Sequence, residues 1–456
     1  MIRPRNEGTI LLVVLIVVAI SAMVAAGVMY RVGAEYKAAS AAEARSQAYA
    51  TAYSGVHKAL AVAVAHADEP AVWLDNPELF ENQLVYDDGA EQWYFSVYSP
   101  ADPDADTVRF GLTDETGKVN LNVAGEDLLA ELGLTGEMID CLKDYTDPDD
   151  ETRPLGAEQA AYDFTIRNHP SIWTIEELLL IHGFDGPVVY GEDVNFNGLL
   201  DANEDDGSLS FPPDDGNGQL DRGLRALATV ASYEYDRDSA GKARKNVNAD
   251  PRSMSGLPKQ TVDFLAAWKE AKQPPLKHPA QLWGLEVEVT RKGPNGQERR
   301  ERVPSGINAD NLHVVLDKLT HLPRGGQMVR GRVNVNTAGA EVLAAAFRSV
   351  GADEQLADQI VQVRGEIPLE ELGNIAWLAS SGVVDDPETM TKIAPLLTTR
   401  SGQFRFFCVG FSIPSGRYCV LEAVIDLAGR SPRIAYLRDI TRLGLPFGFD
   451  VEEIQY

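Results

Sequence analysis

The chain has 456 residues, 44% of them apolar, which is enough for one large or two to three ordinary folded domains. Its 68 acidic residues outnumber its 41 basic residues, so the formal net charge is -27. This charge repels nucleic acid and anionic lipid headgroups, favours cation binding and argues against a DNA-binding function. Three cysteines are too few for a disulfide-stabilised scaffold.

The first element is an apolar run from Thr9 to Met29, preceded by a short leader with Arg3 and Arg5 that ends in Glu7-Gly8. The run holds about 21 residues without charge or proline, enough for a helix to cross a hydrocarbon core of ~30 Å. An Ala-rich sequence follows with no proline before Pro70, which predicts one helix from Thr9 to about His66. A secretory signal peptide cut after Ala26 is the alternative.

A basic leader that ends in Gly and continues directly into such a helix resembles the N-terminus of type IV prepilins and type II secretion pseudopilins. The resemblance implies that a prepilin peptidase cuts between Gly8 and Thr9 and that Thr9 becomes the methylated N-terminus. The helix would then remain as a single-pass anchor in the inner membrane. Most family members have Glu at the fifth mature position, where this chain has Val13. The absence of that Glu is expected mainly of the minor pseudopilin K type.

Strand patterns lie on both sides of a long interior region. The segments 91–99 and 106–117 alternate apolar and polar residues and predict a hairpin after the first helix. Near the C-terminus, 402–427 and 431–440 predict three more strands, with turns at Pro414-Ser415-Gly416 and Ala428-Gly429-Arg430. The region between residues 117 and 400 is therefore expected to be an insertion between strands.

An internal repeat occupies this interior. "GKVNLNVAGEDLLAEL" from Gly117 and "GRVNVNTAGAEVLAAAF" from Gly331 share one pattern, and "ARKNVNADPRS" near Asn246 is a weaker copy. Asn122, Thr337 and Asp250 offer side-chain oxygens that could cap the following helices. The units look like the helix-hairpin-helix modules of DNA-uptake and repair proteins, but they lack the lysines and the Gly-x-Gly that a phosphate-contacting hairpin needs. Packed helical units are therefore the preferred interpretation.

The order of leader, "VNLN" segment, "DPDDETRPLGAEQAAY", "SIWTIEELLLIHGF" and closing strands resembles the type II secretion pseudopilin K family, also called general secretion pathway protein K. The resemblance implies an α+β fold in which a pilin-like long helix and a small antiparallel sheet carry a large inserted, mainly α-helical domain with helix-hairpin-helix-like repeats. The expected parts are the leader (1–8), the transmembrane and pilin-like helix (9–66), pilin-like strands (67–116), the inserted domain with its calcium loops (117–400) and the C-terminal strands (401–456).

The same resemblance implies a non-enzymatic protein at the tip of the periplasmic pseudopilus that helps to start assembly and to export proteins across the outer membrane. Its implied partners are minor pseudopilins of the I and J type, the major pseudopilin, the secretion machinery, the prepilin peptidase and the inner membrane, and no nucleic acid. Two alternatives stay open: a membrane-anchored helix-hairpin-helix protein for DNA binding or uptake, and a secreted calcium-binding adhesion module with a cleaved signal.

The strongest chemical signal is "DVNFNGLLDANE", which fills the pattern D-x-[DN]-x-[DN]-G-x5-E without a gap. Loops of this type bind Ca²⁺ through oxygen atoms, and Gly198 supplies the sharp turn. Leu200, at the eighth position, is expected to point inward. The predicted ligands of a structural Ca²⁺ are Asp193, Asn195, Asn197, the backbone carbonyl of Leu199, Asp201 and Glu204.

A second acidic loop follows in "PPDDGNGQLDRGL", with Pro213 at the first position and Leu224 at the last position. It is expected to bind Ca²⁺ more weakly, through Asp214, Asp215, Asn217 and Asp221.

No motif of an active site occurs: a nucleophile elbow, a P-loop, a zincin motif and Cys-x-x-Cys are all missing from the sequence. We therefore expect no catalysis. A disulfide between Cys408 and Cys419 is allowed if the first C-terminal turn centres near Ile413-Pro414, and an oxidising periplasm would permit it.

Overall fold

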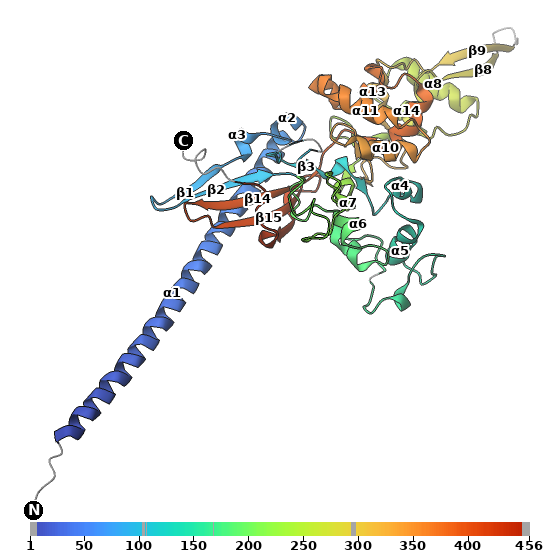
Figure 1. The fold of residues 1–456 in the computed structure, drawn as a ribbon. Coiled ribbons are helices and arrows are strands. Elements are labelled where there is room, and N and C mark those ends of the chain that lie inside the picture. The colour runs from blue at the N-terminus through green and yellow to red at the C-terminus, as the bar shows by residue number, and fades with distance from the viewer. Residues whose placement is uncertain (1–6, 103–104, 106, 167, 293–297, 449–456) are drawn as a thin grey trace, which may run out of the picture.

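The structure is a computed structural model, and it describes every residue except 1–6, 103–104, 106, 167, 293–297 and 449–456. Its most prominent element is one helix of 60 residues, α1 (Glu7–His66), which projects from the rest of the molecule (Figure 1). The sequence has no proline in this span and is rich in alanine, so nothing interrupts the helix. Side chains from Ile10 to Ala39 are exposed. The predicted long helix is confirmed.

The C-terminal half of α1 lies on an antiparallel sheet. The sheet has the order β1-β2-β14-β15-β16, and β3 pairs with β14 as well. These strands are β1 (Gln83–Asp87), β2 (Gln92–Tyr98), β3 (Thr113–Asp114), β14 (Gln403–Ile413), β15 (Tyr418–Asp426) and β16 (Arg433–Asp439). The three C-terminal strands are those predicted. A long helix packed on an antiparallel sheet thus confirms the α+β prediction.

Small residues bring α1 close to the sheet. Ala48, Ala52, Val56 and Ala59 recur about every four residues, so they form one face of the helix, and all are buried. On the sheet, Gly410 leaves room for this face, because a Cβ atom there would lie 2.4 Å from the backbone nitrogen of Ala52. The packing buries the aromatic and aliphatic side chains of β2, β14 and β15 that face α1.

The opposite face of the sheet is also covered. Tyr98, Phe407 and Val409 belong to a second buried cluster on that face, to which Phe196 of the inserted region contributes. Burial on both faces explains why β2 and β14 carry apolar residues at consecutive positions and not only at alternating positions.

The hairpin predicted between 91–99 and 106–117 is reduced to one antiparallel bridge, Ser99 with Arg109. Strand β2 itself pairs with β1 on one edge and with β14 on the other. Gly89, at a φ of 81°, lies in the short turn between β1 and β2, and its N–H is bound by the Asp87 carboxylate. Of the later segment, Thr113–Asp114 forms β3 and pairs with Phe404 and Arg405.

The region between β3 and β14 is built from short helices and two-residue or three-residue strands. The hairpin β8–β9 is its longest sheet element and lies at the far end of the molecule in Figure 1. The remaining helices and strands of the chain are α2 (Pro70–Trp73), α3 (Pro77–Phe80), β4 (Val119–Asn120), α4 (Glu126–Glu131), α5 (Gly136–Thr146), α6 (Gly186–Tyr190), α7 (Gly223–Leu227), β5 (Ala228–Thr229), β6 (Tyr233–Tyr235), β7 (Lys245–Asn246), α8 (Lys259–Glu270), β8 (Glu286–Lys292), β9 (Glu298–Pro304), α9 (Leu312–Lys318), β10 (Leu319–Thr320), β11 (Met328–Arg330), β12 (Val333–Asn334), α10 (Ala340–Arg348), α11 (Gln355–Val363), α12 (Leu369–Leu372), α13 (Trp377–Ser380), α14 (Pro387–Ile393) and β13 (Leu397–Thr398).

The three copies of the sequence repeat open three units of the same plan. Each begins with a two-residue strand that pairs in parallel with the two-residue strand that ends the unit. We call these units the first module (119–229, β4 with β5), the second module (245–320, β7 with β10) and the third module (333–398, β12 with β13). The weak copy near Asn246 is therefore a full member of the set.

The two asparagines of each copy have fixed roles. The first accepts the N–H of the second: Asn120 from Asn122 at 3.1 Å, and likewise in the other modules. The second asparagine then holds a distant loop of its own module, as Asn122 does by accepting the N–H of Ile172 at 2.8 Å and donating to its carbonyl at 3.1 Å. The corresponding pairs are Asn248 with Leu276 and Asn336 with Leu372.

These roles correct the predicted helix caps. Asn122 and Thr337 do not cap the next helices, whose N-caps are Gly125 and Gly339 without a side-chain bond. Thr337 instead donates to Asp114 at 2.7 Å. Asp250 does cap, but the element is a 3-10 turn.

Buried charges join the modules to the sheet. Glu422 of β15 is fully buried and pairs with Arg225 from the first module, with Arg405 of β14 and with Arg438 of β16 at 3.1 Å. Glu115, at the start of the interior region, pairs with Arg405 at 3.1 Å. These ion pairs fix the first module against the sheet.

Candidate metal centre

The predicted calcium loop closes on itself through its two terminal carboxylates. Asp193 accepts the N–H groups of Asn197 and Gly198 at 3.1 and 3.0 Å. Glu204 accepts those of Val194 and Asp201, both at 3.1 Å. The first and last predicted ligands therefore each bind backbone groups of the loop they delimit.

Gly198 is required at the turn of this loop. Its φ is 72°, in the left-handed region that favours glycine. A Cβ atom there would also lie 2.7 Å from the backbone nitrogen of Ala101. The role predicted for this glycine agrees with the geometry.

The middle side chains converge on Asp201. Its carboxylate accepts the side-chain amides of Asn195 at 2.7 Å and Asn197 at 3.1 Å. Asn197 also donates to the carbonyl of Pro446 at 2.8 Å. Asp201 thus joins the side chains of Asn195 and Asn197, and Asn197 ties the loop to the C-terminal segment.

The hydrophobic residues of the loop differ from expectation. Leu199 is half-buried and packs, together with Phe196, against the buried cluster on the face of the sheet opposite α1. Leu200, expected to point inward, is exposed. The loop lies on β14 and its neighbours. Leu199, and not Leu200, therefore faces the apolar surface of the sheet.

The two terminal carboxylates are in surroundings that disfavour their charge. Burial raises the pKa of Asp193 to about 6 and that of Glu204 to about 7. Arg225 and Arg222 lower the pKa of Asp193 only in part. A divalent cation would supply the missing positive charge, and a set of carboxylate, amide and carbonyl oxygens suits Ca²⁺. The donor types of the loop therefore suit Ca²⁺, whereas among the described residues its carboxylates do not form a group with oxygens within 4.8 Å of one another.

The second predicted loop is more open. Asp214 accepts the N–H groups of Gly207 and Gly216, both at 2.8 Å, and Asp215 accepts that of Asn217 at 3.1 Å. Asp221 donates its N–H to Glu192 at 3.1 Å, and its carbonyl accepts the Glu192 N–H. Glu192, directly before the first loop, thus links the two loops.

A third acidic group was missed by the sequence reasoning. Carboxylate oxygens of Asp144, Asp147 and Glu158 lie within 4.8 Å of one another, and these residues could hold a metal ion. Asp144 is on α5, Asp147 directly follows the helix, and Glu158 returns from the next loop. The signal in the sequence was "DYTDPDDETRPLGAE", whose acidic spacing suggests an exposed run rather than a buried group.

This acidic cluster, Asp144, Asp147 and Glu158, is buried and poorly compensated. Asp144 is fully buried, and burial followed by neighbouring carboxylates raises the pKa of Asp147 and of Glu158. Among the residues that the structure describes, both Glu158 oxygens have no hydrogen-bond partner. The Arg153 backbone N–H donates to Asp144 at 3.1 Å, but the Arg153 guanidinium comes no closer than 3.6 Å to this carboxylate.

The N-terminal site lies at the start of α1. Gly8 and Thr9 are within the helix, which begins at Glu7. The leader residues 1–6 lie outside the described residues. From Ile10 onward α1 is long and apolar enough to cross a membrane, with a mean hydropathy of 3.0 in its most apolar window.

Cys408 and Cys419 are free thiols in the structure. The register differs from the one that their bond required: Cys408 lies opposite Leu421, and Cys419 lies opposite Gly410. The turn is centred one residue later than expected, between Pro414 and Ser415, so the cysteines are diagonal neighbours. The predicted pairing geometry is therefore wrong.

Comparison with known proteins supports one family. Residues 333–394 match the family model described as type II secretion system (T2SS), protein K. The resemblance to protein K is confirmed. The matched segment runs from the first residue of the third module to just before β13, so the protein K signature is this module.

A solved structure is also similar. It is the GspK-GspI-GspJ complex from the enterotoxigenic Escherichia coli type 2 secretion system, of which one chain is 11% identical, with a TM-score of 0.42. The similarity covers 88% of this chain and 98% of that chain. No curated protein matches the sequence.

Proposed function

We propose that this chain is a minor pseudopilin at the tip of the type II secretion pseudopilus, where it helps to start assembly and to export proteins across the outer membrane. The observation that carries the proposal is the combination of a protein K segment at 333–394 with a helix that is exposed from Ile10 to Ala39 and packs on a sheet thereafter. The exposed half is available for a membrane and for neighbouring helices of a filament.

The position at the tip follows from two features. Val13 occupies the place where the family usually has the Glu that pairs with the next subunit, so the chain is poorly suited to extend a filament. The region inserted between β3 and β14 is larger than the pilin-like part, and such bulk could hardly repeat at every subunit of a tight helical polymer. We assign 117–400 to this inserted domain, and 67–116 and 401–456 to the pilin-like strands.

The anchor is proposed to be the first part of α1, in the inner membrane, with the bulk of the chain in the periplasm. Processing between Gly8 and Thr9, with methylation of Thr9, would leave the apolar segment in place. The proposed binding partners are minor pseudopilins of the I and J type.

The proposed role of Ca²⁺ is structural. The loop from Asp193 to Glu204 covers the outer face of the sheet through Phe196, and Asn197 reaches the C-terminal segment. An ion there would stabilise the contact between the inserted domain and the sheet. Asp214, Asp215, Asn217 and Asp221 remain a proposed weaker second site.

Copurification tests the partner assignment. The full chain, solubilised in a neutral detergent with Ca²⁺ present, should copurify with coexpressed pseudopilins of the I and J type from the same genome. It should not retard duplex DNA at physiological salt, because its net charge repels phosphate. Micromolar DNA binding without binding to pseudopilins would replace this proposal by the DNA-uptake alternative.

A further inference from the structure

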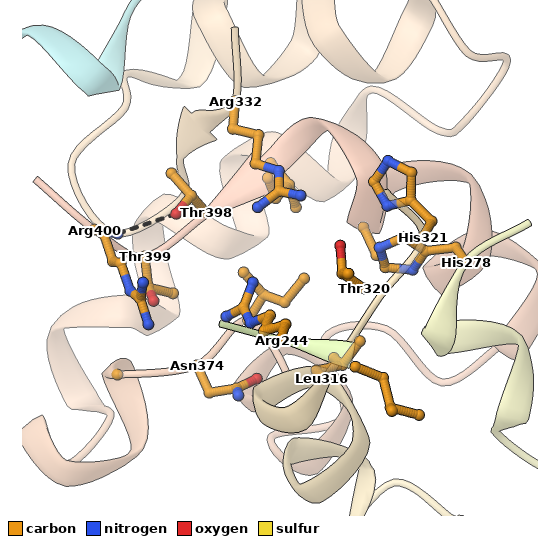
Figure 2. A pocket seen from close by; sticks show the side chains of 15 residues that line it. Arg244, His278, Leu316, Thr320, His321, Arg332, Asn374, Thr398, Thr399 and Arg400 are labelled. Atoms are coloured by element: carbon orange, nitrogen blue, oxygen red, sulfur yellow. Dashed lines mark hydrogen bonds between the residues drawn. The ribbon is translucent and has the colours of Figure 1, made fainter. Parts of the chain in front are cut away.

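A positively charged cavity lies where the second and third modules meet. It has a volume of about 40 Å³ and is lined by the beginning and end of both modules (Figure 2). Arg244 precedes β7 and Arg332 precedes β12, at the same position of the repeat. Thr320 and Thr398 are the last residues of the strands that close the two modules. The repeat itself therefore brings two guanidinium groups to one place.

The third module adds a cation that the others lack. The residue two positions after the closing threonine is Ala231 in the first module and Leu322 in the second, but Arg400 in the third. The N–H of this residue binds the threonine hydroxyl in all three modules. The backbone position is the same in all three modules, but only the third has an arginine there. The additional guanidinium is therefore specific to the junction between the second and third modules.

The carboxylates nearby do not balance these cations. Arg332 pairs with Glu234 at 2.9 Å, and Arg244 pairs with Asp236 at 3.3 Å. Arg400 donates to the carbonyl of Tyr235 at 3.4 Å. Within the part of the chain that the structure describes, no carboxylate lies within 4.0 Å of the Arg400 guanidinium, and no acidic residue lines the cavity.

Two neutral imidazoles complete the wall (Figure 2). Burial lowers the pKa of His278 well below its ordinary value, and His321, Arg332 and Arg244 lower it further. Burial and then Arg332 lower the pKa of His321. Nδ1 of His278 accepts the N–H of Ala280 at 3.2 Å, so the proton of the neutral ring is on Nε2, where it can be donated.

The cavity thus presents guanidinium groups with a net positive charge, threonine hydroxyls that can donate and the Nε2–H of His278, and no carboxylate. A volume of about 40 Å³ holds roughly three waters or one small ion, which excludes nucleotides and peptides. Guanidinium groups bind multi-oxygen anions through charge-assisted hydrogen bonds. We propose that this cavity binds a small tetrahedral oxyanion, sulfate or phosphate, which crosslinks the second and third modules through Arg244, Arg332 and Arg400.

Isothermal titration of the full chain in neutral detergent micelles, with Ca²⁺ present, tests the proposal. Sulfate is the probe because it stays soluble with millimolar Ca²⁺, and chloride at equal ionic strength is the reference. We expect saturable binding of one sulfate, and a loss of affinity of about tenfold or more in Arg400→Gln, since a charge-assisted bond is worth ~1.5–3 kcal/mol. Acetate, which is planar and carries one charge, should bind more weakly.

Two further variants serve as controls, one for the loss of charge and one for misfolding of Arg400→Gln. Arg299→Gln, on the exposed strand β9, removes the same charge elsewhere and should bind sulfate like the parent. Thr399→Leu keeps every arginine and fills the cavity, and it should abolish binding even if Arg400→Gln folds poorly. No saturable binding by the parent, equal binding by Thr399→Leu, or equal affinity for acetate would overturn the proposal.

Discussion

Asp193 and Glu204 are buried at 6% and 1% exposure, at opposite ends of one loop, and each has a raised pKa. Such carboxylates destabilise a fold unless a cation accompanies them. The proposed ion would therefore make the stability of the folded chain depend on Ca²⁺, whereas the stability of an exposed acidic turn would not change with Ca²⁺.

The double variant Asp193→Asn with Glu204→Gln tests whether the stability of the chain depends on Ca²⁺ bound at this loop. The substitutions keep size and remove both charges. We expect Ca²⁺ to raise the thermal midpoint of the parent and to leave that of the variant unchanged, while the variant in EDTA is at least as stable as the parent in EDTA. Differential scanning calorimetry of the full chain measures both.

Glu158→Gln is the matched control for this experiment, because it removes one charge from the acidic cluster at Asp144 instead. If it retains the full calcium response, the response belongs to the loop 193–204. An equal calcium-induced rise in the double variant would contradict the loop as the site.

Arg405 is the shared partner of two buried carboxylates, Glu115 and Glu422. Burial alone would raise the pKa of Glu115, but Arg405 and Lys118 outweigh it and hold the pKa well below its ordinary value. Glu115 is thus kept ionised, and its contribution to stability is present above the ordinary pKa of Glu and is lost as the pH falls below it.

Arg405→Met should destabilise the chain by about 3–5 kcal/mol, because it leaves Glu115 and Glu422 buried with one counter-charge fewer. Urea unfolding at neutral pH measures the loss. The loss should shrink as the pH is lowered toward 4, where the carboxylates can take up protons. Arg442→Met, at an exposed position, is the control and should change stability little. A loss independent of pH would show that packing alone explains the effect.

At the scale of elements, the contact between α1 and the sheet depends on glycines. A Cβ atom at Gly55 would lie 2.3 Å from the sulfur of Cys408 and 2.7 Å from Phe95. At Gly33, on the same helix, a Cβ atom would have nothing within 4 Å. The two positions differ in their surroundings and not in their secondary structure.

Gly55→Ala should therefore lose about 1–3 kcal/mol, because overpacking costs more than the helix gains. Gly33→Ala should gain about 0.5–1 kcal/mol from helix propensity alone. Chemical unfolding of the two variants in the same micelles gives the comparison. A gain in both would mean that α1 does not lie this close to β14.

The elements differed in how well the sequence predicted them. The helix α1 and strands β14 to β16 follow from long local patterns, and both were found as predicted. The hairpin after α1 was not found as predicted, because β2 pairs with β14, more than 300 residues away. The local pattern of 91–99 contains no information about that partner. Likewise, whether Cys408 and Cys419 lie opposite each other depends on the register of β14 and β15, which the turn sequence does not determine.

The candidate metal residues show the same limit. The candidate ligands of the loop 193–204 could be named because they lie in one contiguous segment of the sequence. The cluster of Asp144, Asp147 and Glu158 needs a helix end and a returning loop to meet, and the sequence shows only an acidic run. Asn122 looked like a helix cap for a related reason: its partner, Ile172, lies 50 residues away in the sequence.

At the scale of the whole molecule, the N-terminal processing decides whether the apolar first part of α1 remains in the mature protein. We expect mass spectrometry of the mature protein, purified from its own membrane fraction, to find Thr9 at the N-terminus, because cleavage at Ala26 would remove much of the exposed half of the helix.

Two substitutions distinguish the peptidases. Gly8→Leu should leave the leader on, whereas Ala26→Leu should still yield Thr9. A mature N-terminus at Gly27 that is lost in Ala26→Leu would establish an ordinary signal peptide.

The pairing of β3 with β14 places the start and the end of the inserted region side by side, with Asp114 opposite Phe404. Asp114 also accepts bonds from Asn334, Thr337 and Ser401, so the two ends are clamped together. A force applied to α1 would thus be transmitted to the strands on which α1 lies and not through the modules. The inserted region could then be moved by tension or compression along α1 without being extended.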